Sequence, residues 1–191
     1  MTESEKMKRK DEIRKKAKRE RELSLLLLLL LYQSSANLIR DTCKTGARAD
    51  PNIKYDFCVR TLESDPRSHN AHTLHGLCEA SIDLTIRNAT RARARAQKLM
   101  MKARESVARA CLSDCMDLYA DAVSKLRDSE KAIGSKRYGD ANVWISSAMD
   151  APTTCEDGFG EEGLKSPLSR ENGYVFGLSA ITLAITNRLA N

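Results

Sequence analysis

An all-α protein is predicted from the sequence, in the form of an antiparallel four-helix bundle preceded by two short helices. Glycine and proline are scarce among the 191 residues (9 and 4), and aromatic residues make up only 5%. β-Sandwiches and barrels need frequent turn residues and strands rich in aromatic or β-branched side chains, so this composition argues against them. Neither glycine nor proline occurs between Leu77 and Ile133, where apolar residues recur at intervals of three and four. That spacing places them on one helix face and predicts amphipathic helices.

The first expected elements are two short helical pieces within residues 37–64, broken at Gly46 and Pro51. A long helical pattern then starts near His72 and continues for more than 50 residues, well beyond the usual length of a globular helix. A small domain can bury so long a helix only by folding it back. We place the turn at residues 102–106, with Ser106 as the N-cap of the next helix.

The second half of this pattern carries a bundle seam, in which apolar positions alternate spacings of three and four: Ala108, Cys111, Cys115, Leu118, Ala122 and Leu126. Gly134 is suited to end that helix as a C-cap. A third helix is expected at 136–149, followed by a turn-rich connection at 150–167 and a last helix from about Ser169. These four amphipathic helices predict an antiparallel bundle around one core.

Residues 1–36 have the layout of a secretory signal. Ten Lys/Arg and six Asp/Glu lie in residues 1–22, and the ten-residue apolar run Leu23–Tyr32 is followed by small and polar residues up to Ala36. The run is too short for a permanent membrane anchor, which takes about 20 residues. We expect a charged leader and signal peptide at 1–36 and a mature domain at 37–191, secreted to the cell wall space or, alternatively, delivered to the vacuole.

The net charge of the expected mature domain is lower than that of the whole sequence. The whole sequence has a net charge of +6, which first suggests a nucleic-acid partner, but residues 37–191 alone carry only +2. Within them, residues 87–109 hold eight Lys/Arg and one acid, Glu105. Five of these cations follow helical spacing and form a basic stripe: Arg87, Arg91, Arg95, Lys98 and Lys102. The stripe is either a solvated face or a docking surface for an acidic enzyme rim or an acidic cell-wall polysaccharide.

Six cysteines in an exported chain predict disulfides. Cys43 and Cys58 lie on neighbouring short helices and are expected to clip them together. Cys78 and Cys111 are expected to stay free and buried, because a fold-back near residue 104 separates them by roughly 28 Å along the helix, against a limit of about 7 Å between Cα atoms. Cys155 can reach either Cys111 or Cys115, of which we favour Cys115.

Several motifs along the chain carry a family resemblance: Ile53-x-Tyr55-x-Phe57-Cys58, Asp65-Pro66-Arg67-Ser68, Cys111-Leu112-Ser113-Asp114-Cys115, Ala141-Asn142-Val143-Trp144-Ile145-Ser146-Ser147-Ala148, Thr154-Cys155-Glu156-Asp157-Gly158-Phe159 and Ser166-Pro167-Leu168. With them the chain resembles the plant invertase/pectin methylesterase inhibitor family from about Leu38 to Leu189. The resemblance implies a four-helix bundle with an N-terminal α-hairpin and the disulfides Cys43–Cys58 and Cys115–Cys155.

The same resemblance implies a function. It describes a secreted protein inhibitor with no catalytic activity and no cofactor, which covers the active site of a cell-wall or vacuolar acid invertase (β-fructofuranosidase) or, alternatively, of a pectin methylesterase. A pollen or wall protein of the same fold without inhibitory activity is a remoter alternative. A basic helical nucleic-acid binder is another, and the predicted export argues against it.

Other candidate sites receive weaker support from the sequence. His69, His72 and His75 recur every three residues, but a metal site needs convergence with further ligands, so we interpret them as surface histidines and expect no metal. Asn88-Ala89-Thr90 is an N-glycosylation sequon, so Asn88 is a candidate glycosylation site, although its expected position within a helix lowers the occupancy. The sequence lacks the Gly-x-Ser-x-Gly, His-Glu-x-x-His and P-loop motifs, and nothing in it supports an enzyme.

Overall fold

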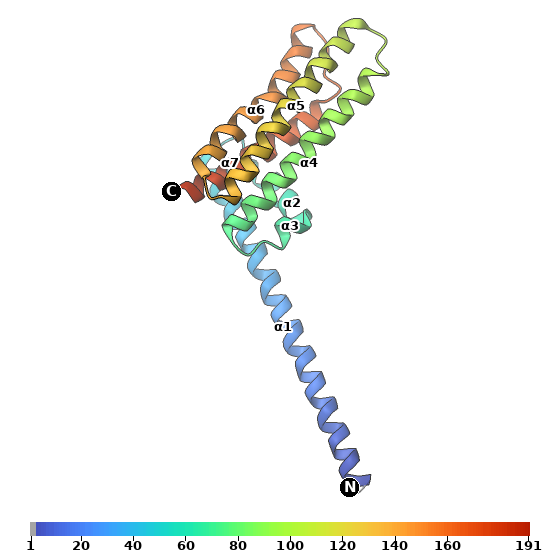
Figure 1. Cartoon of the computed structure of the whole chain (residues 1–191), viewed down its shortest axis with the longest axis vertical. Coiled ribbons are helices and arrows are strands. Elements are labelled where there is room, and N and C mark those ends of the chain that lie inside the picture. The colour runs from blue at the N-terminus through green and yellow to red at the C-terminus, as the bar shows by residue number, and fades with distance from the viewer. Residues whose placement is uncertain (1–2) are drawn as a thin grey trace.

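The computed structural model describes the backbone of residues 3–191 and the side chains of residues 14–26 and 34–191. Its described elements are all helices: α1 (Glu3–Ala49), α2 (Tyr55–Ser64), α3 (Pro66–His69), α4 (Leu74–Met100), α5 (Ser106–Gly134), α6 (Tyr138–Glu161) and α7 (Ser169–Ala190). Helices α4 to α7 form the bundle, while the N-terminal part of α1 projects away from it (Figure 1). The all-α prediction is confirmed.

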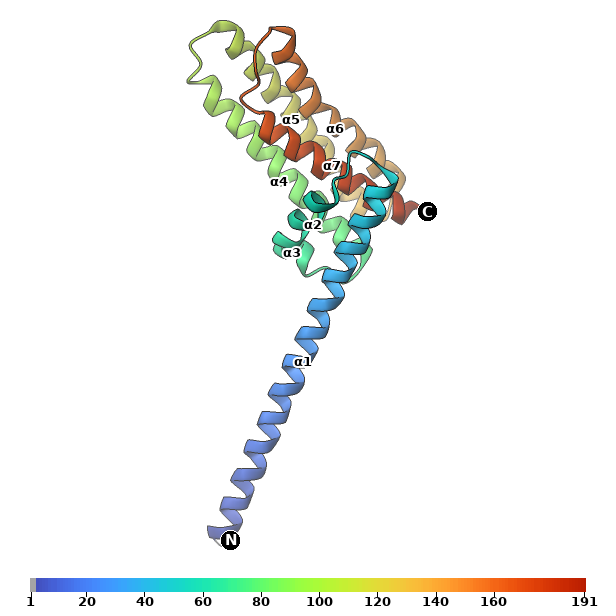
Figure 2. The ribbon, with the colours of Figure 1, turned by 180° about the vertical axis from the view of Figure 1, so that it is seen from behind.

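The four bundle helices alternate in direction, and each packs on its sequence neighbour, with α7 closing the ring against α4 (Figure 2). Tyr119, Leu126, Ile145 and Ile181 are almost fully buried at the centre. Leu126 lies on the predicted seam, but Tyr119 takes the core position that the seam gave to Leu118, which is half-buried. Burial of these side chains supplies the main stabilisation of the helices.

The turn between the first two bundle helices lies at residues 101–105, close to the predicted 102–106. Ser106 is the first residue of α5 and Glu105 is its N-cap, so the predicted cap is off by one residue. The turn is held by the Arg109 guanidinium, which donates to the Ala103 carbonyl oxygen at 2.7 Å. The chain can therefore reverse its direction here without proline or glycine, because a side chain of the next helix donates a hydrogen bond to a backbone carbonyl of the turn.

Helix α6 is longer than the sequence predicted. The expected connection at 150–167 is helical up to Glu161, and α6 continues through Pro152. An internal proline removes one helical hydrogen bond and crowds the preceding turn, but Pro152 and Ala151 are buried and α6 packs along α5 and α7, so tertiary packing outweighs the local preference. The helix ends before Gly163, whose positive φ of 67° lets Leu164 N–H reach the Phe159 carbonyl at 2.9 Å.

The N-terminal hairpin is present, but its two helices end and begin at other residues than the sequence predicted. Helix α1 continues through Gly46 to Ala49, and α2 begins at Tyr55 rather than at Pro51. A Cβ at Gly46 would lie 3.2 Å from Ile53 Cδ1, so this glycine allows the returning chain to approach the helix instead of breaking it. The tight turn is stabilised by the Asp50 carboxylate, which accepts from Asn52 N–H at 2.9 Å.

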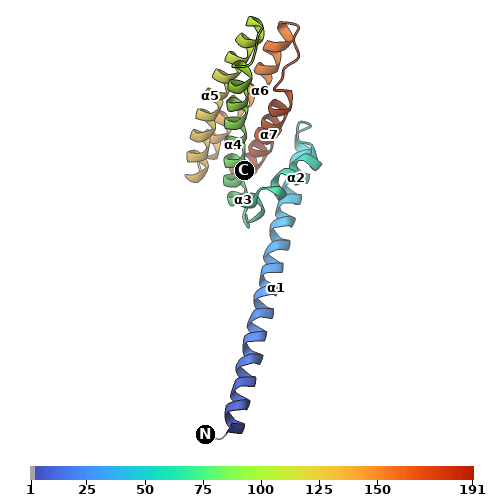
Figure 3. The same ribbon diagram turned by 90° about the vertical axis from the view of Figure 1, so that its right-hand side faces the viewer.

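Helices α2 and α3 lie beside α7 and the first part of α4, as Figure 3 shows from the side. Among the residues that the structure describes, no helix has a stretch both long enough and apolar enough to cross a bilayer.

Gly177→Ala is expected to destabilise the protein by about 1–3 kcal/mol, because overpacking a tight contact forces neighbouring atoms to move. A Cβ there would lie 2.7 Å from Phe57 Cε1, where α2 packs on α7. Urea unfolding of the variant measures the change. Gly173→Ala is the matched control on the same helix, since nothing lies within 4 Å of its Cβ position. Equal stability of the two variants would contradict the predicted clash.

Candidate functional site

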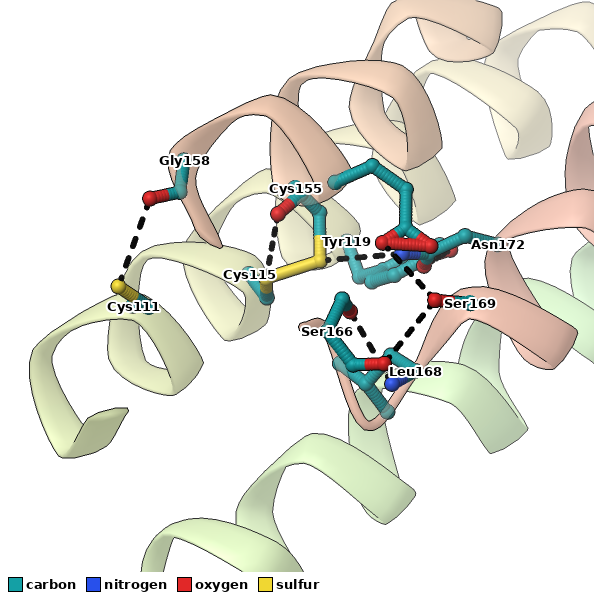
Figure 4. Close-up of a disulfide and its surroundings, with 10 residues drawn as sticks. Cys111, Cys115, Tyr119, Cys155, Gly158, Ser166, Leu168, Ser169 and Asn172 are labelled. Atoms are coloured by element: carbon teal, nitrogen blue, oxygen red, sulfur yellow. Dashed lines mark hydrogen bonds between the residues drawn. A yellow bond between two sulfur atoms is a disulfide. The ribbon is translucent and has the colours of Figure 1, made fainter. Parts of the chain in front are cut away.

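Four of the six cysteines form two disulfides that staple the fold. Cys43–Cys58 joins α1 to α2 with a Cα–Cα distance of 5.7 Å, and Cys115–Cys155 joins α5 to α6 with 4.9 Å. Cys155 lies within helix α6 rather than in the expected connection, so both partners of the second bridge sit on bundle helices (Figure 4). Each disulfide therefore fixes two helices relative to each other.

A polar cluster surrounds the second disulfide and ties α7 to it. Tyr119 on α5 donates its hydroxyl hydrogen to Asn172 Oδ1 at 2.6 Å, and Asn172 Nδ2 lies 3.4 Å from Cys155 Sγ (Figure 4). The Asn172 side chain is buried between the three helices. Burial raises the pKa of Tyr119, with Glu156 and Glu171 adding to the effect, so the hydroxyl stays protonated and the network is a rigid anchor.

The remaining thiols, Cys78 and Cys111, are free and buried. Burial raises the pKa of Cys78 to about 11, although its thiol lies 3.4 Å from the Thr186 hydroxyl, which acts in the opposite direction. Burial also raises the pKa of Cys111, and the carboxylates of Glu162 and Asp114 add to that shift. Because the thiolate is the reactive form, both are poor nucleophiles at neutral pH.

The three histidines do not converge. His69 ends α3, His72 lies in the connection to α4, and His75 is on α4, where its Nδ1 lies 3.0 Å from the Tyr138 hydroxyl. His75 Nε2 lies 3.4 Å from the Glu79 carboxylate. In the part of the chain that the structure describes, no group of His, Cys, Asp and Glu side chains is arranged to hold a metal ion.

The basic stripe divides into parts with different surroundings. Arg87 is half-buried and forms ion pairs with Asp65 and Asp83, and Asp83 also pairs with Arg67 at 2.9 Å. This network fastens α3 to α4, so Arg87 is a structural residue and not a free docking cation. The sequence held one signal for this pairing, because Asp83 lies four residues before Arg87 on the same helix. The Asp65 carboxylate, which also caps α3, comes from 22 residues away.

The other four stripe residues are exposed, and none forms an ion pair with a described residue. Arg91 and Arg95 line a hollow of about 460 Å³ between α4 and α7, together with Asn88, Arg170, Glu171, Tyr174 and Val175. Lys98 lies further along α4, and Lys102 lies just past its end. Arg170 and Tyr174 were not singled out from the sequence, because only the packing of α7 on α4 brings them to the stripe.

A second hollow of about 550 Å³ adjoins the first and shares Asn88, Arg91 and Tyr174 with it. Its other walls come from α2, α3 and α4, including Ser64, Pro66, Arg67 and Leu84. The two hollows therefore adjoin along α4, and we call them together the arginine furrow.

We expect Asn88 to carry no glycan. Its side chain is half-buried in the middle of α4, its amide nitrogen donates to the Leu84 carbonyl at 2.8 Å, and it lines both hollows of the furrow. A glycan attached there would have to leave through the furrow and past the arginines. Intact mass measured before and after endoglycosidase treatment tests this, and a mass loss on treatment that disappears in Asn88→Gln would contradict it.

The fold and these features define an α-helical, disulfide-stapled binding protein that presents a charged depression on one face. Residues 37–185 match the family model described as plant invertase/pectin methylesterase inhibitor. The chain belongs to this family.

Curated relatives include both kinds of inhibitor. Two proteins named "Putative invertase inhibitor", from Platanus orientalis and Platanus acerifolia, are 40% and 41% identical over 81% of this chain, covering 91% and 87% of their own lengths. "Pectinesterase inhibitor 12" of Arabidopsis thaliana is 35% identical over 83% of this chain and 91% of its own length. A crystal structure of a pectin methylesterase inhibitor from Arabidopsis, in mutant form A, superimposes with a TM-score of 0.63 over 70% of this chain and 88% of its own, at 22% identity. That likeness shows the shared fold.

Proposed function

We propose that this chain is a protein inhibitor of an acid invertase and blocks the enzyme's active site sterically. The observation that carries the proposal is the 40–41% identity to the two Platanus proteins named "Putative invertase inhibitor", over 91% and 87% of their lengths. The Arabidopsis protein named "Cell wall / vacuolar inhibitor of fructosidase 2" is a further relative, at 30% identity over 82% of this chain. Like these relatives, the chain is an inhibitor and not an enzyme.

The structure supports a steric mechanism through its rigidity. Every helix of residues 37–191 is held against a neighbour. The contacts that do this are the two disulfides, the Tyr119–Asn172 hydrogen bond and the Arg87 ion-pair network. A binder that is already ordered loses little conformational entropy on docking, so more of its contact energy appears as affinity. A bundle of this kind can cover a substrate cleft without supplying any reacting group.

Secretion is part of the proposal. Leu23, Leu25 and Leu26 are more than half exposed on the projecting part of α1, where apolar side chains have no core to enter (Figure 1). A signal peptide at 1–36 accounts for this exposure, because the segment would be removed after export. Part of the apolar run, residues 27–32, has side chains outside the described residues. N-terminal sequencing of the secreted protein should begin at Asn37, and retention of residues 1–36 would contradict the cleavage.

Lys98 and Lys102 are the stripe residues that lie outside the furrow, and we expect them to steer the bundle toward an acidic enzyme surface. Lys98→Glu with Lys102→Glu should slow association several-fold at low salt and flatten its salt dependence, leaving the dissociation rate nearly unchanged. Stopped-flow or surface-plasmon kinetics at two ionic strengths measure this. Arg127→Glu, which reverses an exposed cation on α5 away from the stripe, is the control; an unchanged association rate in the double variant would remove the steering role.

The testing experiment is a parallel titration of the purified protein against one acid invertase and one pectin methylesterase, at the acidic pH of the cell wall. We expect stoichiometric loss of invertase activity and no loss of methylesterase activity. The reverse selectivity would establish the second candidate, pectin methylesterase inhibition, which is favoured by the relatives named pectinesterase inhibitors. Inhibition of neither enzyme would overturn both and leave a wall protein without inhibitory activity.

A further inference from the structure

The arginine furrow holds cations that the fold itself does not neutralise. Arg91 and Arg95 are one turn apart on α4, and Arg170 faces the same hollow from α7, with Glu171 as the one carboxylate in its lining. Like charges at i,i+4 on a helix repel by a few tenths of a kcal/mol. Neither Arg91, Arg95 nor Arg170 has an ion-pair partner among the described residues, so the hollow carries an uncompensated positive charge.

The types of side chain that line the hollow restrict the chemistry of the ligand that it can bind. All three cations are arginines, whose planar forks bind carboxylates and phosphates through paired hydrogen bonds. Tyr174 lines the same hollow, and its ring is positioned by an edge-on contact with Phe57, with centroids 5.1 Å apart. Asn88 uses its amide nitrogen on Leu84, which leaves its carboxamide oxygen to accept a hydrogen bond from a ligand. The lining therefore suits a molecule with carboxylates, hydroxyl donors and an apolar face.

The second hollow of the furrow restricts the choice of ligand further. The second hollow also contains Arg67 and Arg87, but both are paired there with Asp65 and Asp83. Apart from the shared Arg91, the second hollow therefore adds no unpaired cation, and the unpaired arginines gather at the end of the furrow that Arg95 and Arg170 line. A compact anion would occupy only the charged end, whereas an extended chain of hydroxylated units can occupy both.

We propose that the arginine furrow binds a linear uronic-acid oligosaccharide, with carboxylates on Arg91, Arg95 and Arg170 and a sugar ring against Tyr174. Hydroxyl groups of the sugar chain extend into the second hollow, where Arg67 and Arg87 are already paired. This extends the wall setting of the proposed function and gives the protein a second ligand, bound independently of its enzyme target.

Isothermal titration of the secreted full-length mature protein with an oligogalacturonate of defined length tests the proposal. We expect saturable binding that weakens steeply between low and physiological salt, as a charge-dominated contact does. Arg91→Gln combined with Arg170→Gln should lower the affinity at least tenfold. Arg93→Gln is the matched control, because Arg93 is exposed on the same helix but does not line either hollow. An equal loss in the control, or no binding by the unaltered protein, would overturn the proposal.

Three further titrants identify the chemistry. The fully methyl-esterified oligomer should bind at least tenfold more weakly, since esterification removes the carboxylates. Inorganic phosphate and an acidic peptide of equal charge should also bind at least tenfold more weakly, because neither offers both carboxylates and a hydroxylated ring. Equal or tighter binding of any of these would overturn the assignment to a uronic-acid chain.

The invertase assay, run on the same variants, separates this proposal from the proposed function. If the furrow is a distinct site, Arg91→Gln with Arg170→Gln loses oligogalacturonate binding and keeps inhibition. Inhibition without oligogalacturonate binding by the unaltered protein would overturn the furrow proposal alone. Oligogalacturonate binding without inhibition would overturn the invertase proposal alone.

Discussion

Replacing Cys115 and Cys155 together by alanine is expected to lower the free energy of unfolding by about 4 kcal/mol. The bridge closes a loop of sequence separation 40, and loop-closure entropy of the unfolded chain gives about 4 kcal/mol for that length. For a domain of this size the melting temperature should fall by roughly 8–16 °C. The bridge also lies beside the buried Tyr119–Asn172 hydrogen bond, so its loss loosens the junction of α5, α6 and α7.

Thermal unfolding followed by circular dichroism measures this effect. The matched comparison is Cys43→Ala with Cys58→Ala, whose sequence separation of 15 predicts a smaller loss of about 3 kcal/mol. Both cysteines must be replaced in each case, because Cys115→Ala alone would leave Cys155 free near Cys111, one turn away from Cys115 on α5. A double variant at 115 and 155 as stable as the unaltered protein would contradict the stapling role.

Asp65→Ala is expected to destabilise the fold by about 2–3 kcal/mol through two losses. The Asp65 carboxylate caps α3 by accepting from Ser68 N–H at 3.0 Å and from its hydroxyl at 3.1 Å, and a lost cap typically costs about 1 kcal/mol. It also pairs with Arg87 while being only 7% exposed. Removing it leaves the half-buried guanidinium with Asp83 alone, and an uncompensated buried charge is destabilising.

Urea unfolding of a double-mutant cycle separates the two contributions. Asp65→Asn retains an oxygen that can cap Ser68 and removes only the charge, so it should be less destabilising than Asp65→Ala. Arg87→Gln combined with Asp65→Ala should be less destabilising than the sum of the single variants, because the ion pair is lost only once. Strict additivity would show that the pair makes no contribution.

Most of the fold could be predicted from local signals. The uninterrupted helical pattern from Leu77 to Ile133, the break near residue 104 and the last helix from Ser169 depend on periodicity and capping, and the structure has them within a few residues. The C-terminal half of helix α6 could not be predicted from the sequence. Pro152 is a local helix breaker, and only packing on α5 and α7 keeps the chain helical as far as Glu161.

The candidate site was predicted only in part for the same reason. The basic stripe follows from helical spacing on α4, but spacing does not show which cations are neutralised. Arg87 is neutralised by Asp65 from the segment before α3, and the furrow is completed by Arg170 and Tyr174 from α7. The Asp83–Arg87 pair is an i,i+4 contact that helical spacing contains. The contacts of Asp65, Arg170 and Tyr174 join residues distant in sequence, which periodicity does not encode.

The most direct test of the proposed function is the kinetic pattern of invertase inhibition. Initial rates of sucrose hydrolysis are measured over a range of sucrose concentrations at several fixed concentrations of the protein. A bundle that covers the substrate cleft should raise the apparent KM in proportion to its concentration and leave kcat unchanged, so saturating sucrose restores full activity. A fall in kcat that saturating sucrose does not reverse, or the absence of inhibition, would contradict active-site blockage.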